Sequence, residues 1–228
     1  MVGFGGGSSY LAILILAGFS YQKIPSLALI CNLIVASCGF FNFARAGHFR
    51  MSKTLPFIIL SIPCAYVGAR VHIGQRLFGL LLGLALLAVA VRMFIPEREY
   101  PQRPLSRTAV GCIALPSGAL LGFAAGLLGI GGGIFLSPLL IALRWTHVKE
   151  AGASASFFIL VNSLAGLAGH FQKDMVHFSS IFPLSIAVFL GGQWGSRVGA
   201  FQIPLRALSR VMGVLIFAAS FKLILEAL

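Results

Sequence analysis

Gly129-Ile130-Gly131-Gly132-Gly133 is a run of glycines set inside an apolar stretch and followed by Pro138. The same pattern, with Phe in place of Ile, occurs at the start of the chain as Gly3-Phe4-Gly5-Gly6-Gly7. Each glycine costs roughly 1 kcal/mol relative to alanine in a helix interior. Such a run therefore predicts either close helix packing or a broken helix whose backbone N–H and C=O groups face a ligand.

The composition around these glycines is that of a membrane protein. Hydrophobic residues make up 58% of the 228 and charged residues 10%, with a mean hydropathy of +0.97, whereas soluble domains contain roughly 25% charged residues. The net charge of +12 comes from Lys and Arg scattered between apolar spans, which is typical of loops at a membrane surface and not of a nucleic-acid-binding domain. We therefore predict an all-α, multi-pass protein of the inner (plasma) membrane whose partners are the lipid bilayer and a small anion, with a homo-oligomer left open.

Apolar segments divide the chain into two halves on either side of one polar linker. We predict a first transmembrane repeat over 1–95, a polar linker over 96–107 and a second repeat over 108–228. The expected half-helices and spans are Ser8–Phe19, Leu27–Ala44, Thr54–Ala69, Leu77–Phe94, Thr108–Leu128, Ile134–Leu143, Ala151–Ala168, Ser179–Gly195 and Ala207–Ala227. Each half would then contain a glycine-rich broken or re-entrant helix and about three spanning helices.

Matching segments indicate that the two halves are duplicated. Ala46-Gly47-His48-Phe49 matches Ala168-Gly169-His170-Phe171, and Gly68-Ala69-Arg70-Val71 resembles Gly195-Ser196-Arg197-Val198. These pairs occur in the same order and at nearly the same separation as the two glycine motifs. Internal repeats of this kind are a hallmark of transporter folds.

The relative orientation of the halves depends on whether each glycine segment crosses the membrane. If it crosses, the halves are parallel and Lys and Arg divide almost evenly between the two sides. If it dips in and returns, the halves are inverted and one side keeps only Lys23, Arg70, Arg76, Lys173 and Lys222. The positive-inside rule favours the second case, with the linker in the cytoplasm.

Glycine turns at membrane depth provide a physical means of binding an anion, because amide N–H groups and the positive ends of half-helices face it. The helix after each motif carries polar residues that can donate hydrogen bonds without bringing charge into the bilayer. We predict a substrate site made of Gly5, Gly6, Gly7, Asn32, Gly131, Gly132, Gly133, Ser154 and Ser156. For Asn32 and Ser156, hydrogen bonding between helices is an equal alternative, and it is our expectation for Ser37, Asn162 and Ser163.

Two arginines at span ends, Arg70 and Arg197, are candidates for attracting an anion toward the site, with snorkelling to the headgroups as the alternative. The spacing of Cys31, Cys38, Cys64 and Cys112 indicates neither a disulfide framework nor a zinc site. The sequence contains no H-E-x-x-H and no G-x-S-x-G motif, and no span holds a central carboxylate. We therefore predict no cofactor, no metal and no enzymatic activity.

Taken together, these residues resemble the sulfite exporter TauE/SafE family, also called TSUP or DUF81. The resemblance is carried by the two G-x-G-G-G motifs, by Glu150-Ala151-Gly152-Ala153-Ser154-Ala155-Ser156 and by the segments Gly68–Arg70 and Gly195–Arg197. It implies a transporter with two repeated halves that moves sulfite, sulfonates or similar anions as a secondary carrier. Because that family has an apolar segment before the first motif, we expect a shortened N-terminus here. The alternatives are a passive anion channel or facilitator, and a non-transporting membrane assembly subunit.

Overall fold

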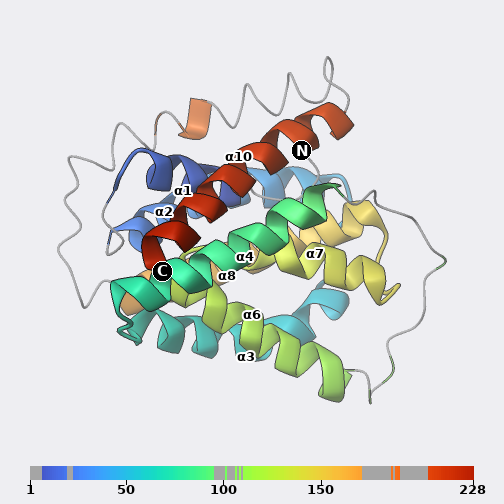
Figure 1. Cartoon of the computed structure of the whole chain (residues 1–228). Coiled ribbons are helices and arrows are strands. Elements are labelled where there is room, and N and C mark those ends of the chain that lie inside the picture. Colours follow the sequence, from blue (N-terminus) through green and yellow to red (C-terminus); the bar gives the residue numbers. More distant parts are fainter. Residues whose placement is uncertain are drawn as a thin grey trace.

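The fold is a bundle of helices (Figure 1). The computed structural model describes residues 7–19, 23–94, 110–170 and 205–228, together with positions 101, 106, 108, 186 and 188–190. Its principal helices are α1 (Gly7–Leu16), α2 (Ile24–Arg45), α3 (Met51–Arg70), α4 (Gln75–Phe94), α6 (Leu115–Leu128), α7 (Gly133–Ala142), α8 (Val148–His170) and α10 (Leu205–Ala227). A five-residue π-helix, Val110–Ala114, leads into α6.

Five of the described helical segments are long and apolar enough to cross a membrane. They are Ile24–Arg45, Met51–Arg70, Gln75–Arg92, Val110–Leu128 and Val148–His170, while α7 is a shorter apolar helix. A bilayer core about 30 Å thick needs roughly 20 helical residues per crossing. The chain is therefore a multi-pass, all-helical membrane protein over the described residues.

The glycine motif of the second half lies between α6 and α7. Gly129 ends α6 in the left-handed region with φ 74°, and Gly131 and Gly132 follow with φ 77° and 70°. Side chains rarely tolerate this conformation, so glycine is required at these positions. The turn takes the chain out of one helix and into the next within four residues.

The chain folds back at this turn, so that α6 and α7 form a helical hairpin, while the re-entry of this hairpin into the membrane remains a prediction. Ala114, which precedes α6, and Trp145, which follows α7, both belong to one buried cluster around Phe57. The start of α6 and the end of α7 therefore lie at the same end of the bundle. The ring centroids of Phe57 and Trp145 are 5.9 Å apart.

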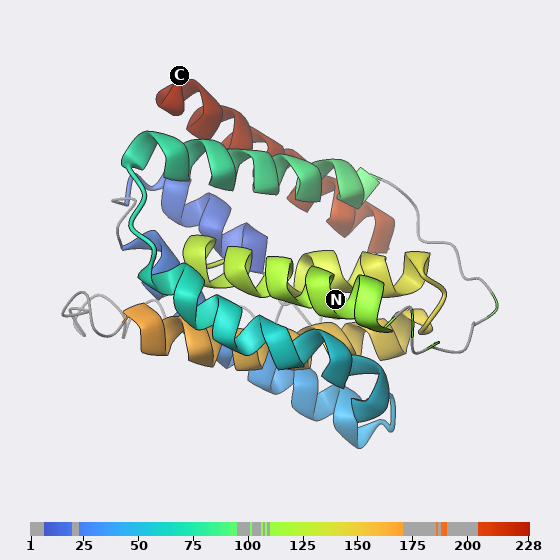
Figure 2. The same ribbon diagram turned by 90° about the horizontal axis from the view of Figure 1, so that it is seen from below.

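Helix α3 of the first half packs parallel to α6 along a ladder of glycines. Gly118, Gly122 and Gly126 lie directly against the backbone of Phe57, Ser61 and Ala65, in that order along both helices. Small residues at four-residue spacing let two helix backbones approach closely, so that van der Waals packing holds the helices together in lipid. The two helices lie side by side in Figure 2.

Two further helix pairs each combine one helix from the first predicted half with one from the second. In each pair, the two helices run in opposite directions. In α2 and α8, a Cβ on Gly39 would lie 3.2 Å from Ser156 Oγ, and a Cβ on Gly166 would lie 3.0 Å from Leu29 Cδ1. The order of these contacts along the two helices makes the pair antiparallel.

The order of the glycine contacts also makes α4 and α10 antiparallel. A Cβ on Gly79 would lie 3.3 Å from Ala227 Cβ and one on Gly83 would lie 2.8 Å from Ile224 Cγ1. At the end of this pair, Arg76 Nε donates to Ala227 O at 2.8 Å. Opposed directions are what inverted halves require, while the duplication and its boundaries at 95 and 108 remain predictions.

Candidate functional site

The turn between α6 and α7 is buried along its whole length, from Gly129 to Gly133. Two of its amides are used by the backbone: Gly129 N–H donates to Ala125 O at 3.0 Å and Gly133 N–H donates to Gly131 O at 2.9 Å. Within the described part of the chain, the N–H groups of Ile130, Gly131 and Gly132 donate no backbone hydrogen bond. Three buried amides are thus available to a hydrogen-bond acceptor. They lie at the N-terminal end of α7, which is the positive end of its helix dipole.

Asn32 of α2 holds this turn from the opposite half of the chain. Its side chain is fully buried, and Nδ2 donates to Gly129 O at 3.1 Å. A Cβ on Gly131 would lie 2.9 Å from the same Nδ2 atom. Asn32 therefore fixes the carbonyl that ends α6 and lines the turn. The hydrogen bond between helices, which the sequence left open for this residue, is observed, and its role in binding an anion remains a prediction.

Helix α8 covers the other side of the turn. A Cβ on Gly132 would lie 2.8 Å from Phe158 Cε1, and one on Gly133 would lie 2.6 Å from Ala155 O. Real Cβ atoms essentially never lie this close to a neighbouring atom. Glycine is therefore needed at Gly132 and Gly133 for the close approach of α8, and at Gly132 for the backbone conformation as well. The turn is enclosed between α2 and α8.

Ser154 and Ser156, two predicted site residues, have partners elsewhere. Ser154 Oγ accepts a hydrogen bond from Thr54 Oγ1 of α3 at 2.8 Å. Ser156 Oγ donates to Gly152 O, four residues earlier in α8, at 2.9 Å. Both are buried, and their role in binding an anion remains a prediction.

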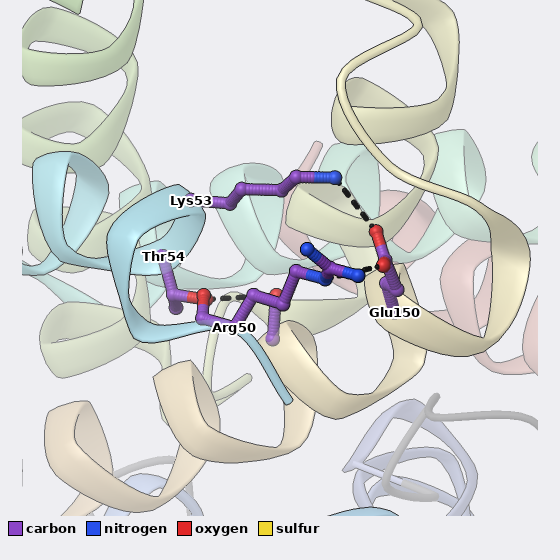
Figure 3. Close-up of polar contacts among 5 residues, drawn as sticks. Arg50, Lys53, Thr54 and Glu150 are labelled. Carbon is purple, nitrogen blue, oxygen red and sulfur yellow. Dashed lines mark hydrogen bonds and ion pairs between the residues drawn. The ribbon is translucent and has the colours of Figure 1, made fainter. Parts of the chain in front are cut away.

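An ionic cluster joins the beginnings of α3 and α8 (Figure 3). Glu150 forms ion pairs with two cations: its Oε1 lies 2.9 Å from Arg50 Nε, and its Oε2 lies 2.8 Å from Lys53 Nζ. The Glu150 side chain is only 13% exposed. The Thr54–Ser154 hydrogen bond lies one helical turn deeper. Because two cations share one carboxylate at the N-terminal end of α8, where the dipole also favours negative charge, this cluster ties the two halves together at that end of the bundle.

Asn162 and Ser163 correct one expectation from the sequence. They make no hydrogen bond to another described helix, and Asn162 Nδ2 donates to Phe158 O within α8 at 2.8 Å. Asn162 Oδ1 and Ser163 Oγ have no hydrogen-bond partner among the described residues. The same expectation fails for Ser37, whose hydroxyl donates to Leu33 O of its own helix at 2.6 Å. The sequence signal at Asn162 and Ser163 is a pair of adjacent polar residues in the middle of an apolar span.

The remaining predicted site residues lie apart from the turn or beyond the described residues. Arg70 is exposed at the end of α3, where its guanidinium lies 4.8 Å from the ring centroid of Tyr66. Gly7 begins α1. Gly5, Gly6 and Arg197 fall outside the described residues, as does most of the predicted span Ser179–Gly195.

Comparison with known proteins connects this geometry to a family. The model of the family described as Sulfite exporter TauE/SafE matches residues 1–223. The chain belongs to this family. It is therefore a multi-pass membrane transporter of the TauE/SafE type.

Relatives of this TauE/SafE chain carry the name of probable membrane transporter proteins. It is 31% identical to the probable membrane transporter protein y4hK of Sinorhizobium fredii, over 98% of this chain and 91% of that relative. It is 21% identical to the probable membrane transporter protein YunE of Bacillus subtilis, over 76% and 70% of the two chains. A probable membrane transporter protein of Xylella fastidiosa is 35% identical over 38% of this chain and 34% of its own length. No solved structure matches.

Proposed function

We propose that this TauE/SafE protein is a secondary carrier for small sulfur-containing anions such as sulfite or sulfonates, held at paired glycine-rich helix breaks. The observation that supports the proposal most directly is the set of three buried amides at Ile130, Gly131 and Gly132. Amide N–H groups at a helix N-terminus bind oxyanions through hydrogen bonds and the helix dipole. In a medium of low dielectric constant these interactions are stronger than in water.

The electrostatic surroundings are compatible with an anion at this depth. The carboxylates in the described helices are Glu150 and Glu226, both near helix ends, and Glu150 is paired with two cations. An anion at the turn would therefore meet no opposing carboxylate from the described helices. Uncharged donors avoid the cost of burying a permanent cation while the site is empty.

Inverted halves supply a mechanism for the carrier. The antiparallel pairs α2 with α8 and α4 with α10 each join one half to the other, and the turn is held between α2 and α8. Rocking of one half against the other would expose the turn to each side in alternation. The second break predicted at Gly5–Gly7 would face the same centre from the opposite side.

The charges at the two ends of the bundle support an orientation in the inner membrane. Helices α3 and α8 begin at one end of the bundle, and α2 and α4 end there. The cations at this end include Arg45, Arg50, Lys53, Arg92, Arg144 and Lys149. Toward the other end lie Lys23, Arg70, Arg76 and Lys222. We place the first end in the cytoplasm, following the positive-inside rule.

Cysteine labelling tests this orientation. In a variant without Cys31, Cys38, Cys64 and Cys112, a single cysteine at Gly47 is expected to react only from the cytoplasm, and one at Gly74 only from the periplasm. Neither glycine has other atoms within 4 Å of a built Cβ, although Gly47 has a φ of 74°. Labelling of both positions from the same side would rule out the topology.

Transport in proteoliposomes tests the function. With labelled sulfite outside, we expect uptake that unlabelled sulfite or methanesulfonate inhibits and chloride does not. Preloading vesicles with sulfite should accelerate entry of the label, because a carrier exchanges substrate faster than it returns empty. Uptake without this acceleration would favour the passive facilitator, and no movement of any anion by folded protein would reject transport of this class.

A further inference from the structure

Asn162 and Ser163, adjacent in the middle of α8, carry two oxygen atoms that no other described residue uses. Both residues are fully buried. Elsewhere in the described helices, Ser61, Ser156 and Ser220 donate their hydroxyl hydrogens to carbonyls of their own helix. Asn162 Oδ1 and Ser163 Oγ make no hydrogen bond to any described group. Leaving such atoms unpaired costs free energy, so their position needs an explanation.

The pair lies at the level of the helix break. One turn before Asn162, Phe158 contacts Gly132, and one turn after it, a Cβ on Gly166 would lie 3.4 Å from Gly126 Cα. Asn162 is therefore flanked on α8 by residues that contact both sides of the turn.

Helix α2 places Asn32 at the same level. Since Leu29 faces Gly166 and Gly39 faces Ser156 along this antiparallel pair, Asn32 lies across from Ser163. The Asn32 amide in turn holds Gly129 O. The unused oxygens of α8 thus border the turn on the side where α6 ends.

The end of α6 supplies further oxygen atoms. Ala125 O accepts from Gly129 N–H, and Gly126 O lies 3.0 Å from His170 Nε2. The next carbonyls, those of Leu127 and Leu128, accept no hydrogen bond from the described residues. Helix carbonyls at this position carry partial negative charge, in contrast to the amides at the start of α7.

We propose that a monovalent hard cation of sodium size binds here, with Asn162 Oδ1, Ser163 Oγ and the carbonyls at the end of α6 as ligands. Hard cations prefer oxygen ligands, and neutral oxygens suit a single charge. The inference rests on the proposed function: the two ends of one helix break would hold a cation and an anion side by side. The cation would offset the anion's charge in the membrane and couple its transport to the sodium gradient.

Thermal unfolding of the purified protein tests the cation site without any transport assay. The probe is sodium chloride against choline chloride at equal ionic strength. At about 100 times the dissociation constant, sodium is expected to raise the unfolding midpoint of the wild type by about 5 °C or more. Asn162→Leu and Ser163→Ala should lose most of this rise, whereas Asn162→Asp should keep it because it retains the oxygen ligand.

Ser220→Ala is the matched control, because that serine is equally buried and its hydroxyl is already used by Phe217 O. It should respond to sodium as the wild type does. A wild type that responds equally to both salts, or an Asn162→Leu variant that keeps the sodium response, would overturn the proposal and assign the oxygens to buried water. Anion transport without a sodium response would leave the carrier function intact, and a sodium response without anion transport would leave the cation site intact.

Discussion

Gly126→Ala is expected to lower the yield of folded protein at least tenfold, or to lower its unfolding midpoint by more than 5 °C. The new Cβ would lie against the Ala65 carbonyl, 2.7 Å from its carbon and 3.0 Å from Ala65 Cα. Because the obstacle is backbone and not a flexible side chain, α3 and α6 would have to separate along their length. Overpacking costs typically about 1–3 kcal/mol, and a separation would also weaken the contacts at Gly118 and Gly122.

Gly111→Ala is the control for this substitution, since a Cβ there has no other atom within 4 Å. It should be neutral or slightly stabilising through helix propensity. Size-exclusion profiles and thermal unfolding in detergent measure both variants. If Gly126→Ala unfolded at the wild-type temperature, the close approach of α3 to α6 would be wrong.

Asn32→Leu is expected to reduce sulfite transport at least tenfold while leaving much of the protein folded. The two side chains are similar in size, but leucine cannot donate to Gly129 O. A buried carbonyl left without its donor costs about 1–3 kcal/mol, and the turn would lose its link to α2. The amides at Ile130, Gly131 and Gly132 would then no longer be held in one arrangement.

Ser37→Ala, in the same helix, controls for a lost polar side chain, since its hydroxyl bonds only to Leu33 O and it is exposed. Transport by this variant should match the wild type. Initial rates of uptake, normalised to folded protein, make the comparison. Wild-type rates in Asn32→Leu would show that the turn does not depend on Asn32 and would remove it from the substrate site.

The sequence alone determined the class of this protein and, for several of the described helices, the position of the ends to within a few residues. Expected spans such as Leu27–Ala44 and Thr54–Ala69 are observed as Ile24–Arg45 and Met51–Arg70. Apolar length and glycine content are local properties that can be read along the chain. The family resemblance, carried by the glycine motifs, was confirmed by the comparison over residues 1–223.

Only the tertiary structure decided which polar groups meet. Asn32 bonds a carbonyl 97 residues away, and Ser154 bonds Thr54 at a separation of 100. Among the described residues, nothing pairs with Asn162 Oδ1 or Ser163 Oγ. The direction, tilt and rotation of each helix decide which polar groups come into contact. These orientations depend on all the contacts of the bundle at once. An apolar span has little sequence periodicity to show which face turns inward, so the residues of the site become apparent only when the helices are packed together.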